Sequence, residues 1–302
     1  MRSNQTSTHT PRFFTPEALK RIGRLDLRAK YVVEGLMSGM HKSPFFGHSL
    51  EFLQHREYVP GDDLRRIDWK VWGKQDRFYV KQYEDETNLN ATLLVDASES
   101  MLYGQHRAGM SKYEYACTLA ITLAYILLRQ QDAVGLIRFD EEIGSIAPQK
   151  TGRSQLNTLI QALDIEKPKA KTEIESTLMK AAEVFPRRGM VLIFSDLFAP
   201  REGLWKGLKR LRSCGHDVIL FHVLDDDELE FTFSGPTQFE GLEVPQKLRC
   251  NPRALREGYL EALHAFLDEV RIGCAANQVD YTLVRTTDAF DLTLSRMLLK
   301  RN

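Results

Sequence analysis

ATLLVDASES, at residues 91–100, is the stretch that decides the fold, because its short apolar run ends in an acid that two serines follow. The apolar part is long enough for a buried strand and too short for a helix. In a parallel sheet, Asp96 would lie at the carboxyl end of this strand, where α/β folds bind their ligands. Asp96, Ser98 and Ser100 then form a cluster of oxygen atoms, which suits a small hard cation such as Mg²⁺.

Downstream of this stretch, strand-like runs alternate with helical patterns, and Ser111 with Glu114 forms a capping box at the first helix. This alternation predicts an α/β fold with a doubly wound, mostly parallel, Rossmann-type sheet that helices cover on both faces. Residues 101–110 are expected to be a loop and residues 230–243 a β-hairpin insertion. Further strands are predicted at residues 133–139, 143–147, 190–195, 218–224 and 279–284, and helices at residues 112–130, 154–163, 173–185, 203–212, 251–272 and 294–298.

A second acid, Asp196, follows the fourth predicted strand. In a sheet of order 3-2-1-4-5-6 the first and fourth strands are neighbours, and the ligand-binding crevice lies between them. Asp196 should therefore meet the cluster at residues 96–100. Thr172 lies in the loop before the helix at residues 173–185, where it either adds a third hydroxyl or only caps that helix together with Glu175.

The N-terminal part is expected to form a disordered tail at residues 1–14 and a separate segment at residues 15–88, ahead of the α/β domain at residues 89–302. A helix should begin after Thr15 and continue through Leu25. Residues 78–83 have the alternation of a strand. A dense charged segment lies between them and either forms a buried ion-pair network that packs on the α/β domain or also shapes a partner-binding surface; its candidate residues are Asp62, Asp63, Arg66, Asp68 and Trp69.

Composition excludes several functional classes. Lys+Arg and Asp+Glu are equal at 41 each, so no overall field favours nucleic acid or an anionic membrane. The four cysteines form no C-x-x-C pair, which indicates reduced thiols rather than a zinc site. The longest apolar run, residues 116–128, is shorter than the roughly 20 residues that a membrane-spanning helix needs, and no signal-peptide pattern opens the chain. We therefore expect a cytoplasmic protein.

The second half of the chain resembles a von Willebrand factor A domain, whose metal-ion-dependent adhesion site is D-x-S-x-S with a distant Thr and Asp. The positions that match this motif are Asp96, Ser98, Ser100, Thr172 and Asp196, although Thr172 lies in K-T-E where the site usually shows Gly-x-Thr or Gly-Thr-Asp. From about residue 25 to its end the chain resembles the DUF58 family, through EYVPGDDLRRIDW at residues 57–69, YVKQYEDETN at residues 79–88 and then DASES. This resemblance implies an A-like domain that acts beside a MoxR-type AAA+ ATPase.

The chemistry of such a site favours binding over catalysis. Neutral hydroxyl ligands leave much of the charge of Mg²⁺ or Mn²⁺ uncancelled, so the ion attracts an anionic oxygen such as that of a partner's Asp or Glu. We therefore expect a metal-dependent protein-interaction module rather than an enzyme. It would be an accessory or adaptor of the ATPase in the assembly or maturation of other proteins.

Two alternatives belong to other functional classes. A Mg²⁺-dependent phosphohydrolase would use Asp96 as its nucleophile, but it needs a second acid two residues on, where Ser98 stands. The chain also has no G-x-x-x-x-G-K-[ST] loop, which argues against nucleotide hydrolysis in cis. Nucleic-acid binding through the basic N-terminal helix predicts a steep salt dependence, and the balanced charge makes it the weakest alternative.

Overall fold

The computed structural model describes residues 15–40, 54–57, 79–82, 89–140, 143–164, 174–235, 237–240 and 247–299. Contacts divide the chain into two units, of which the first combines Met1–Leu36 with Leu89–Asn302 and the second is Met37–Asn88. In the second unit, β1 (Gln54–Glu57) pairs antiparallel with β2 (Tyr79–Gln82), so the strand expected at residues 78–83 is present. The central sheet and the candidate site belong to the first unit.

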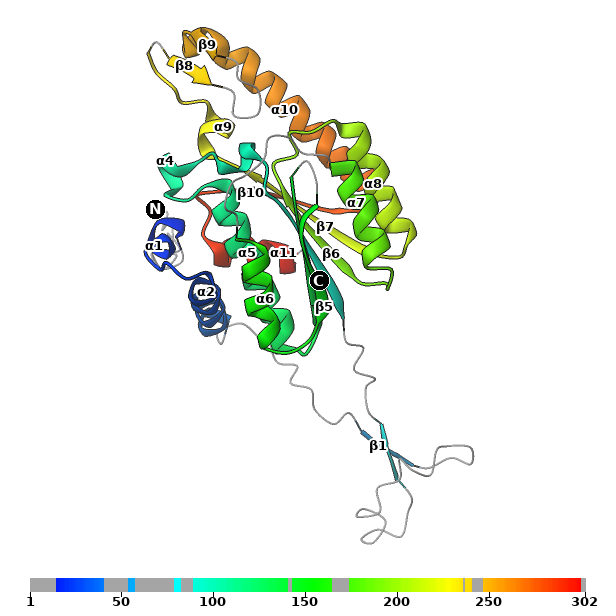
Figure 1. The fold of residues 1–302 in the computed structure, drawn as a ribbon. Coiled ribbons are helices and arrows are strands. Elements are labelled where there is room, and N and C mark those ends of the chain that lie inside the picture. The colour runs from blue at the N-terminus through cyan, green and yellow to red at the C-terminus, as the bar shows by residue number, and fades with distance from the viewer. Residues whose placement is uncertain are drawn as a thin grey trace, which may run out of the picture. The chain divides into compact units, whose positions relative to one another are not determined.

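The described part of the first unit is built on a six-stranded sheet (Figure 1). Its strands are β3 (Asn90–Asp96), β4 (Ala133–Phe139), β5 (Ile143–Lys150), β6 (Met190–Ser195), β7 (Asp217–Leu224) and β10 (Asp280–Arg285). They lie in the order β10-β7-β6-β3-β4-β5, and every pair is parallel except β4 with β5. This is the expected 3-2-1-4-5-6 order of a doubly wound sheet, and the predicted α/β fold is confirmed.

Helices cover both faces of this sheet (Figure 1). α7 (Ile174–Val184), α8 (Arg201–Ser213) and α10 (Pro252–Ala276) contribute to one core. α5 (Lys112–Arg129), α6 (Ser154–Ala162) and α11 (Phe290–Leu299) lie on the other side, where Tyr115 of α5 stacks on Phe290 of α11 at 4.3 Å between ring centroids. No helix among the described residues is long and apolar enough to span a bilayer.

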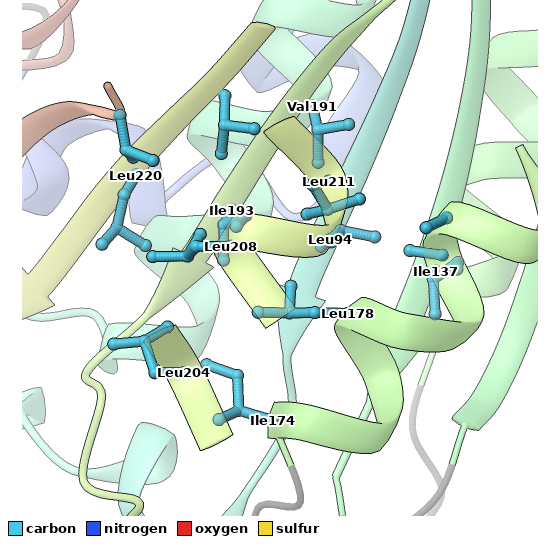
Figure 2. Close-up of a cluster of buried hydrophobic side chains, with 14 of the residues drawn as sticks. Leu94, Ile137, Ile174, Leu178, Val191, Ile193, Leu204, Leu208, Leu211 and Leu220 are labelled. Carbon is cyan, nitrogen blue, oxygen red and sulfur yellow. The ribbon is translucent and has the colours of Figure 1, made fainter. Parts of the chain in front are cut away.

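The core between the sheet and α7 and α8 consists mainly of aliphatic side chains (Figure 2). Leu94 and Ile193 come from the neighbouring central strands, and Leu178 comes from α7. Gly207 of α8 faces Leu178, and a Cβ atom added at Gly207 would lie 2.6 Å from the Cβ atom of Leu178. The two helices therefore approach each other closely because position 207 has no side chain.

Three local predictions are corrected by the structure. The helix expected to run from Thr15 through Leu25 is broken, because α1 (Pro16–Lys20) ends before α2 (Leu25–Met40) begins and Arg28 Nε donates to the backbone oxygen of Ile22 at 2.6 Å in between. The loop expected at residues 101–110 contains helical turns η2 (Glu99–Leu102) and α4 (Gln105–Ala108).

The third correction concerns the insertion after β7. The hairpin expected at residues 230–243 lies further along the chain, where β8 (Thr237–Glu240) pairs antiparallel with β9 (Lys247–Cys250). The acidic residues before it form a short helix, α9 (Asp226–Glu230). Asp225 caps this helix by accepting from the backbone N–H of Asp227 at 2.9 Å. The local capping therefore places a helical turn directly after β7, and the hairpin forms only beyond it.

Candidate functional site

Asp96 is the last residue of β3 and is 0% exposed at the carboxyl end of the sheet. Its Oδ1 accepts a hydrogen bond from the backbone N–H of Ser98 at 3.0 Å. Its Oδ2 accepts a 2.6 Å hydrogen bond from the hydroxyl of Ser195, which is the last residue of the neighbouring strand β6. The carboxylate of Asp96 is therefore oriented by one bond within its own turn and one bond across two strands.

The two serines of the motif turn toward each other. Ser98 is buried and Ser100 is half-buried, and their hydroxyls form a hydrogen bond with each other at 3.0 Å between the oxygen atoms. Mg²⁺ binds its octahedral ligands at about 2.0–2.1 Å, which places two adjacent ligand oxygens about 3 Å apart. The spacing of these hydroxyls therefore fits two adjacent ligands of such an ion. The described residues contain no group of three or more His, Cys, Asp or Glu side chains that could hold a metal ion.

Asp196 lies directly after β6 and is also buried, but it has a strong partner. Its Oδ2 lies 2.7 Å from Nζ of Lys112, the first residue of α5, and its Oδ1 accepts from the backbone N–H of Phe198 at 3.3 Å. Nζ of Lys112 also donates to Oε1 of Glu228 at 2.6 Å. The ring of Phe198 lies over the ammonium with its centroid 4.9 Å away. Asp196 therefore forms a buried ion pair with Lys112.

The electrostatics of the two acids differ. Burial and then the charge of Asp196 raise the pKa of Asp96 to about 7, against the opposing effect of the hydrogen bonds from Ser195 and Ser98. Burial alone would lower the pKa of Lys112, but Asp196 and Glu228 outweigh it, so the pKa of Lys112 is raised and its ammonium stays charged. Among the described residues, the site therefore groups the carboxyls of Asp96, Asp196 and Glu228 with the ammonium of Lys112.

A neutral histidine fixes the backbone next to Asp196. Nε2 of His222 lies 2.9 Å from the backbone oxygen of Asp196, and Nδ1 lies 2.9 Å from the hydroxyl of Tyr281. Because a carbonyl oxygen can only accept, Nε2 carries the proton and Nδ1 accepts from Tyr281. Burial lowers the pKa of His222 to about 4, so the ring is neutral at pH 7.

The acidic turn α9 adjoins the site through Glu228. Oε2 of this residue accepts from the backbone N–H of Asp225 at 2.8 Å and caps α9, while its Oε1 holds Lys112. Gly104, with φ of 107°, contacts Asp225, and a Cβ atom added at Gly104 would lie 2.5 Å from Asp225 Oδ2. The loop after β3 and the loop after β7 are therefore in direct contact.

The structure brings Asp96, Ser98 and Ser100 together and places Asp196 close enough for its charge to act on Asp96. The other candidate residues lie outside the described residues: Thr172, Asp62, Asp63, Arg66, Asp68 and Trp69. Sequence reasoning missed Lys112, Ser195 and Glu228. One signal was present, because a lysine at the start of a buried, apolar helix opposes the helix dipole and needs acidic partners.

Strand order and site together define a doubly wound α/β protein with an acid and serine cluster at the carboxyl ends of two adjacent strands. A family model described as "Protein of unknown function DUF58" matches residues 54–266, and the chain belongs to this family. Similar proteins include uncharacterised proteins of Mycobacterium bovis and Mycobacterium tuberculosis, each 27% identical over 270 residues that cover 86% of this chain and 83% of the relative.

Solved structures similar to the chain include three with TM-scores below 0.5. BatB from Bacteroides thetaiotaomicron has a TM-score of 0.45 and 19% identity and covers 70% of this chain and 98% of its own. An aerotolerance-related membrane protein from Bacteroides fragilis has a TM-score of 0.42 and 18% identity, covering 70% and 99%. The SpRpn10 VWA domain has a TM-score of 0.41 and 8% identity, covering 70% and 95%.

Proposed function

We propose that this protein is a metal-dependent protein-interaction module. In this proposal Ser98, Ser100 and Asp96 hold a Mg²⁺ or Mn²⁺ ion, and Asp196 and Thr172 complete its surroundings. The observation that carries the proposal is the 3.0 Å separation of the Ser98 and Ser100 hydroxyls beside the buried carboxylate of Asp96. A bound ion would supply a positive charge that accepts a carboxylate oxygen from an Asp or Glu of the partner.

Apolar side chains near the site support a protein partner. Leu102, in the turn after the serines, is 39% exposed, and Phe198, in the loop after Asp196, is 43% exposed. Aromatic side chains are enriched in protein interfaces, whose buried centre is more apolar than the rim, while the ion contact would fix the orientation of the partner. The proposed interface therefore combines one metal-bound carboxylate with apolar contacts from two loops.

The proposed partner is a MoxR-type AAA+ ATPase, by resemblance to the DUF58 family, and the module would act as its accessory in the cytoplasm during assembly or maturation of other proteins. The residue two positions after Asp96 supports binding rather than nucleophilic attack. A phosphohydrolase that uses Asp96 as its nucleophile needs a second acid there for the proton of the leaving group, and Ser98 occupies that position.

Titration calorimetry of the EDTA-stripped full chain with MgCl₂ and with MnCl₂ tests the metal site. Wild type should bind one ion, and Ser98→Ala with Ser100→Ala should bind at least about tenfold more weakly, since two ligands are lost. Ser213→Ala is the matched control, because the Ser213 hydroxyl lies on an exposed surface and donates to Arg210 O. Equal binding by wild type and the double variant would refute the site.

The partner is tested separately by affinity capture from a lysate, once with Mg²⁺ and once with EDTA. Recovery of an AAA+ ATPase only in the presence of Mg²⁺ is the expected result. Recovery that is equal in EDTA would contradict a contact made through the ion. A phosphatase screen with Asp96→Asn as control addresses the remaining alternative, and turnover that this substitution abolishes would replace the interaction proposal.

A further inference from the structure

Lys112 places a permanent positive charge beside the candidate metal site. Its Nζ lies 2.7 Å from Asp196 Oδ2 and 2.6 Å from Glu228 Oε1, and the side chain is 0% exposed. The ring of Phe198 lies over the ammonium with its centroid at 4.9 Å. Water therefore screens this charge less than it would screen that of an exposed lysine, so the charge acts more strongly on the adjacent acids.

The position of Lys112 is fixed by the fold. Ser111 and Glu114 form both bonds of a capping box at the start of α5, and Lys112 is the first residue of that helix. Its backbone N–H donates to the backbone oxygen of Tyr103 at 2.8 Å, directly after the turn that carries Ser100. The ammonium is therefore held on the same loop system as the candidate metal ligands.

We propose that Lys112 is a built-in competing cation that weakens divalent metal binding at the Asp96 and Asp196 site. This inference rests on the proposed function. One oxygen of Asp196 accepts from Lys112 and the other accepts from the backbone N–H of Phe198. The ammonium of Lys112 therefore already neutralises most of the negative charge of Asp196. A divalent ion near Asp96 is attracted by Asp196 and Glu228 and repelled by Lys112. The site therefore binds its ion tightly only when a partner's carboxylate restores the missing negative charge.

A merely structural role of Lys112 predicts the opposite result. If Lys112 only holds Asp196 in place, its removal disorders that acid and weakens metal binding. If Lys112 competes with the ion, its removal strengthens metal binding. The direction of the change in affinity separates the two roles, and Glu228 supplies the complementary substitution because it is the second acid on the same ammonium.

The test measures Mg²⁺ and Mn²⁺ affinity of the EDTA-stripped full chain by calorimetry for three variants. Lys112→Met removes a positive charge and should bind the metal ion at least about tenfold more tightly than wild type. Glu228→Gln removes a negative charge and should bind the ion more weakly. The double variant, with the net charge of wild type, should return toward the wild-type affinity. Lys180→Met, which removes an exposed lysine 3.2 Å from Glu183, should change nothing.

A second readout is the rise in thermal unfolding midpoint on adding metal, which should be larger for Lys112→Met than for wild type. Glu228→Gln keeps Lys112 and still has a side chain that can cap α9 from the third position of the helix. This variant therefore tests the inference by itself if Lys112→Met does not fold. Unchanged or weaker binding by Lys112→Met, or unchanged or tighter binding by Glu228→Gln, overturns the inference. Binding by Lys112→Met but not by wild type would support it while overturning the proposed function, and binding by neither would overturn both.

Discussion

The hydroxyl of Ser195 donates a 2.6 Å hydrogen bond to Oδ2 of Asp96, joining the last residues of two adjacent parallel strands. The same Ser195 oxygen accepts from the backbone N–H of Leu197 at 3.0 Å. One buried hydroxyl therefore orients the first acid of the site and shapes the loop that carries the second. Its removal is a direct test of how the sheet positions the candidate ligands.

Ser195→Ala should destabilise the protein by about 1–3 kcal/mol, because it leaves a buried carboxylate oxygen and a buried N–H without this partner. The same substitution should weaken Mg²⁺ binding, since Asp96 loses the bond that orients it. Urea unfolding measures the first effect and titration calorimetry the second. Ser213→Ala, on the exposed end of α8, should change stability by less than about 0.5 kcal/mol. Equal stability of the two variants would contradict the structural role of Ser195.

Asp96→Asn should make the metal-free protein more stable at pH 8 while it abolishes metal binding. Burial and the charge of Asp196 raise the pKa of Asp96 to about 7. At pH 8 the carboxylate of Asp96 is therefore ionised in the folded chain, although its burial and the neighbouring negative charge disfavour the ionised form. A neutral amide accepts from Ser98 and donates to Ser195 without that cost. Urea unfolding in EDTA at pH 8 measures the change, and a less stable Asp96→Asn variant would show that the carboxylate itself supports the fold.

Gly207→Ala should destabilise the protein although alanine is the better helix former. The gain in helix propensity is about 1 kcal/mol, but the new Cβ atom would lie 2.6 Å from Leu178 Cβ, and such overpacking costs about 1–3 kcal/mol. Gly258→Ala is the matched control, since an added Cβ at this exposed position of α10 meets no heavy atom within 4 Å. It should stabilise the protein by up to about 1 kcal/mol. Thermal or urea unfolding should therefore give changes of opposite sign.

His216 should make folding sensitive to acid. Burial lowers the pKa of His216 below its ordinary value of 6.5, so near and below that pH the unfolded chain binds more protons than the folded one. His216 should therefore contribute a decrease in the free energy of unfolding as the pH falls from 7.5 to 5.5, whereas Asp96, with its pKa raised to about 7, contributes an increase over the same interval. Relative to wild type, His216→Gln should gain stability as the pH falls, whereas His264→Gln, at an exposed position, should follow wild type. The same pH dependence in all three proteins would argue against this role of His216.

The sequence was sufficient for the sheet because its strands are short apolar runs between helices of clear period. Asp96 and Asp196 each follow such a run, so the expected strand order alone placed them at adjacent strand ends, as the register of Val95 with Phe194 shows. The capping box of Ser111 and Glu114 was also predictable, because its two hydrogen bonds are local. These features depend on residues close together in the chain or on general rules of α/β topology.

The partners of Lys112 could not be predicted in this way. Its contacts with Asp196 and Glu228 join residues that are 84 and 116 positions apart, and they depend on how α5, the β6 loop and α9 pack together. Sequence periodicity does not carry that information. The break between α1 and α2 was missed because the apolar spacing continues across it, whereas the bond from Arg28 to the backbone oxygen of Ile22 becomes visible only in three dimensions.

The contact between Gly104 and Asp225 has a mechanical consequence. With φ of 107° and no room for a Cβ atom, Gly104 leaves the loop after β3 in contact with the loop that starts α9. Any side chain at position 104 would therefore push apart the loop that carries the serine turn and the loop that starts α9, so the two loops can keep their present spacing only with a glycine there.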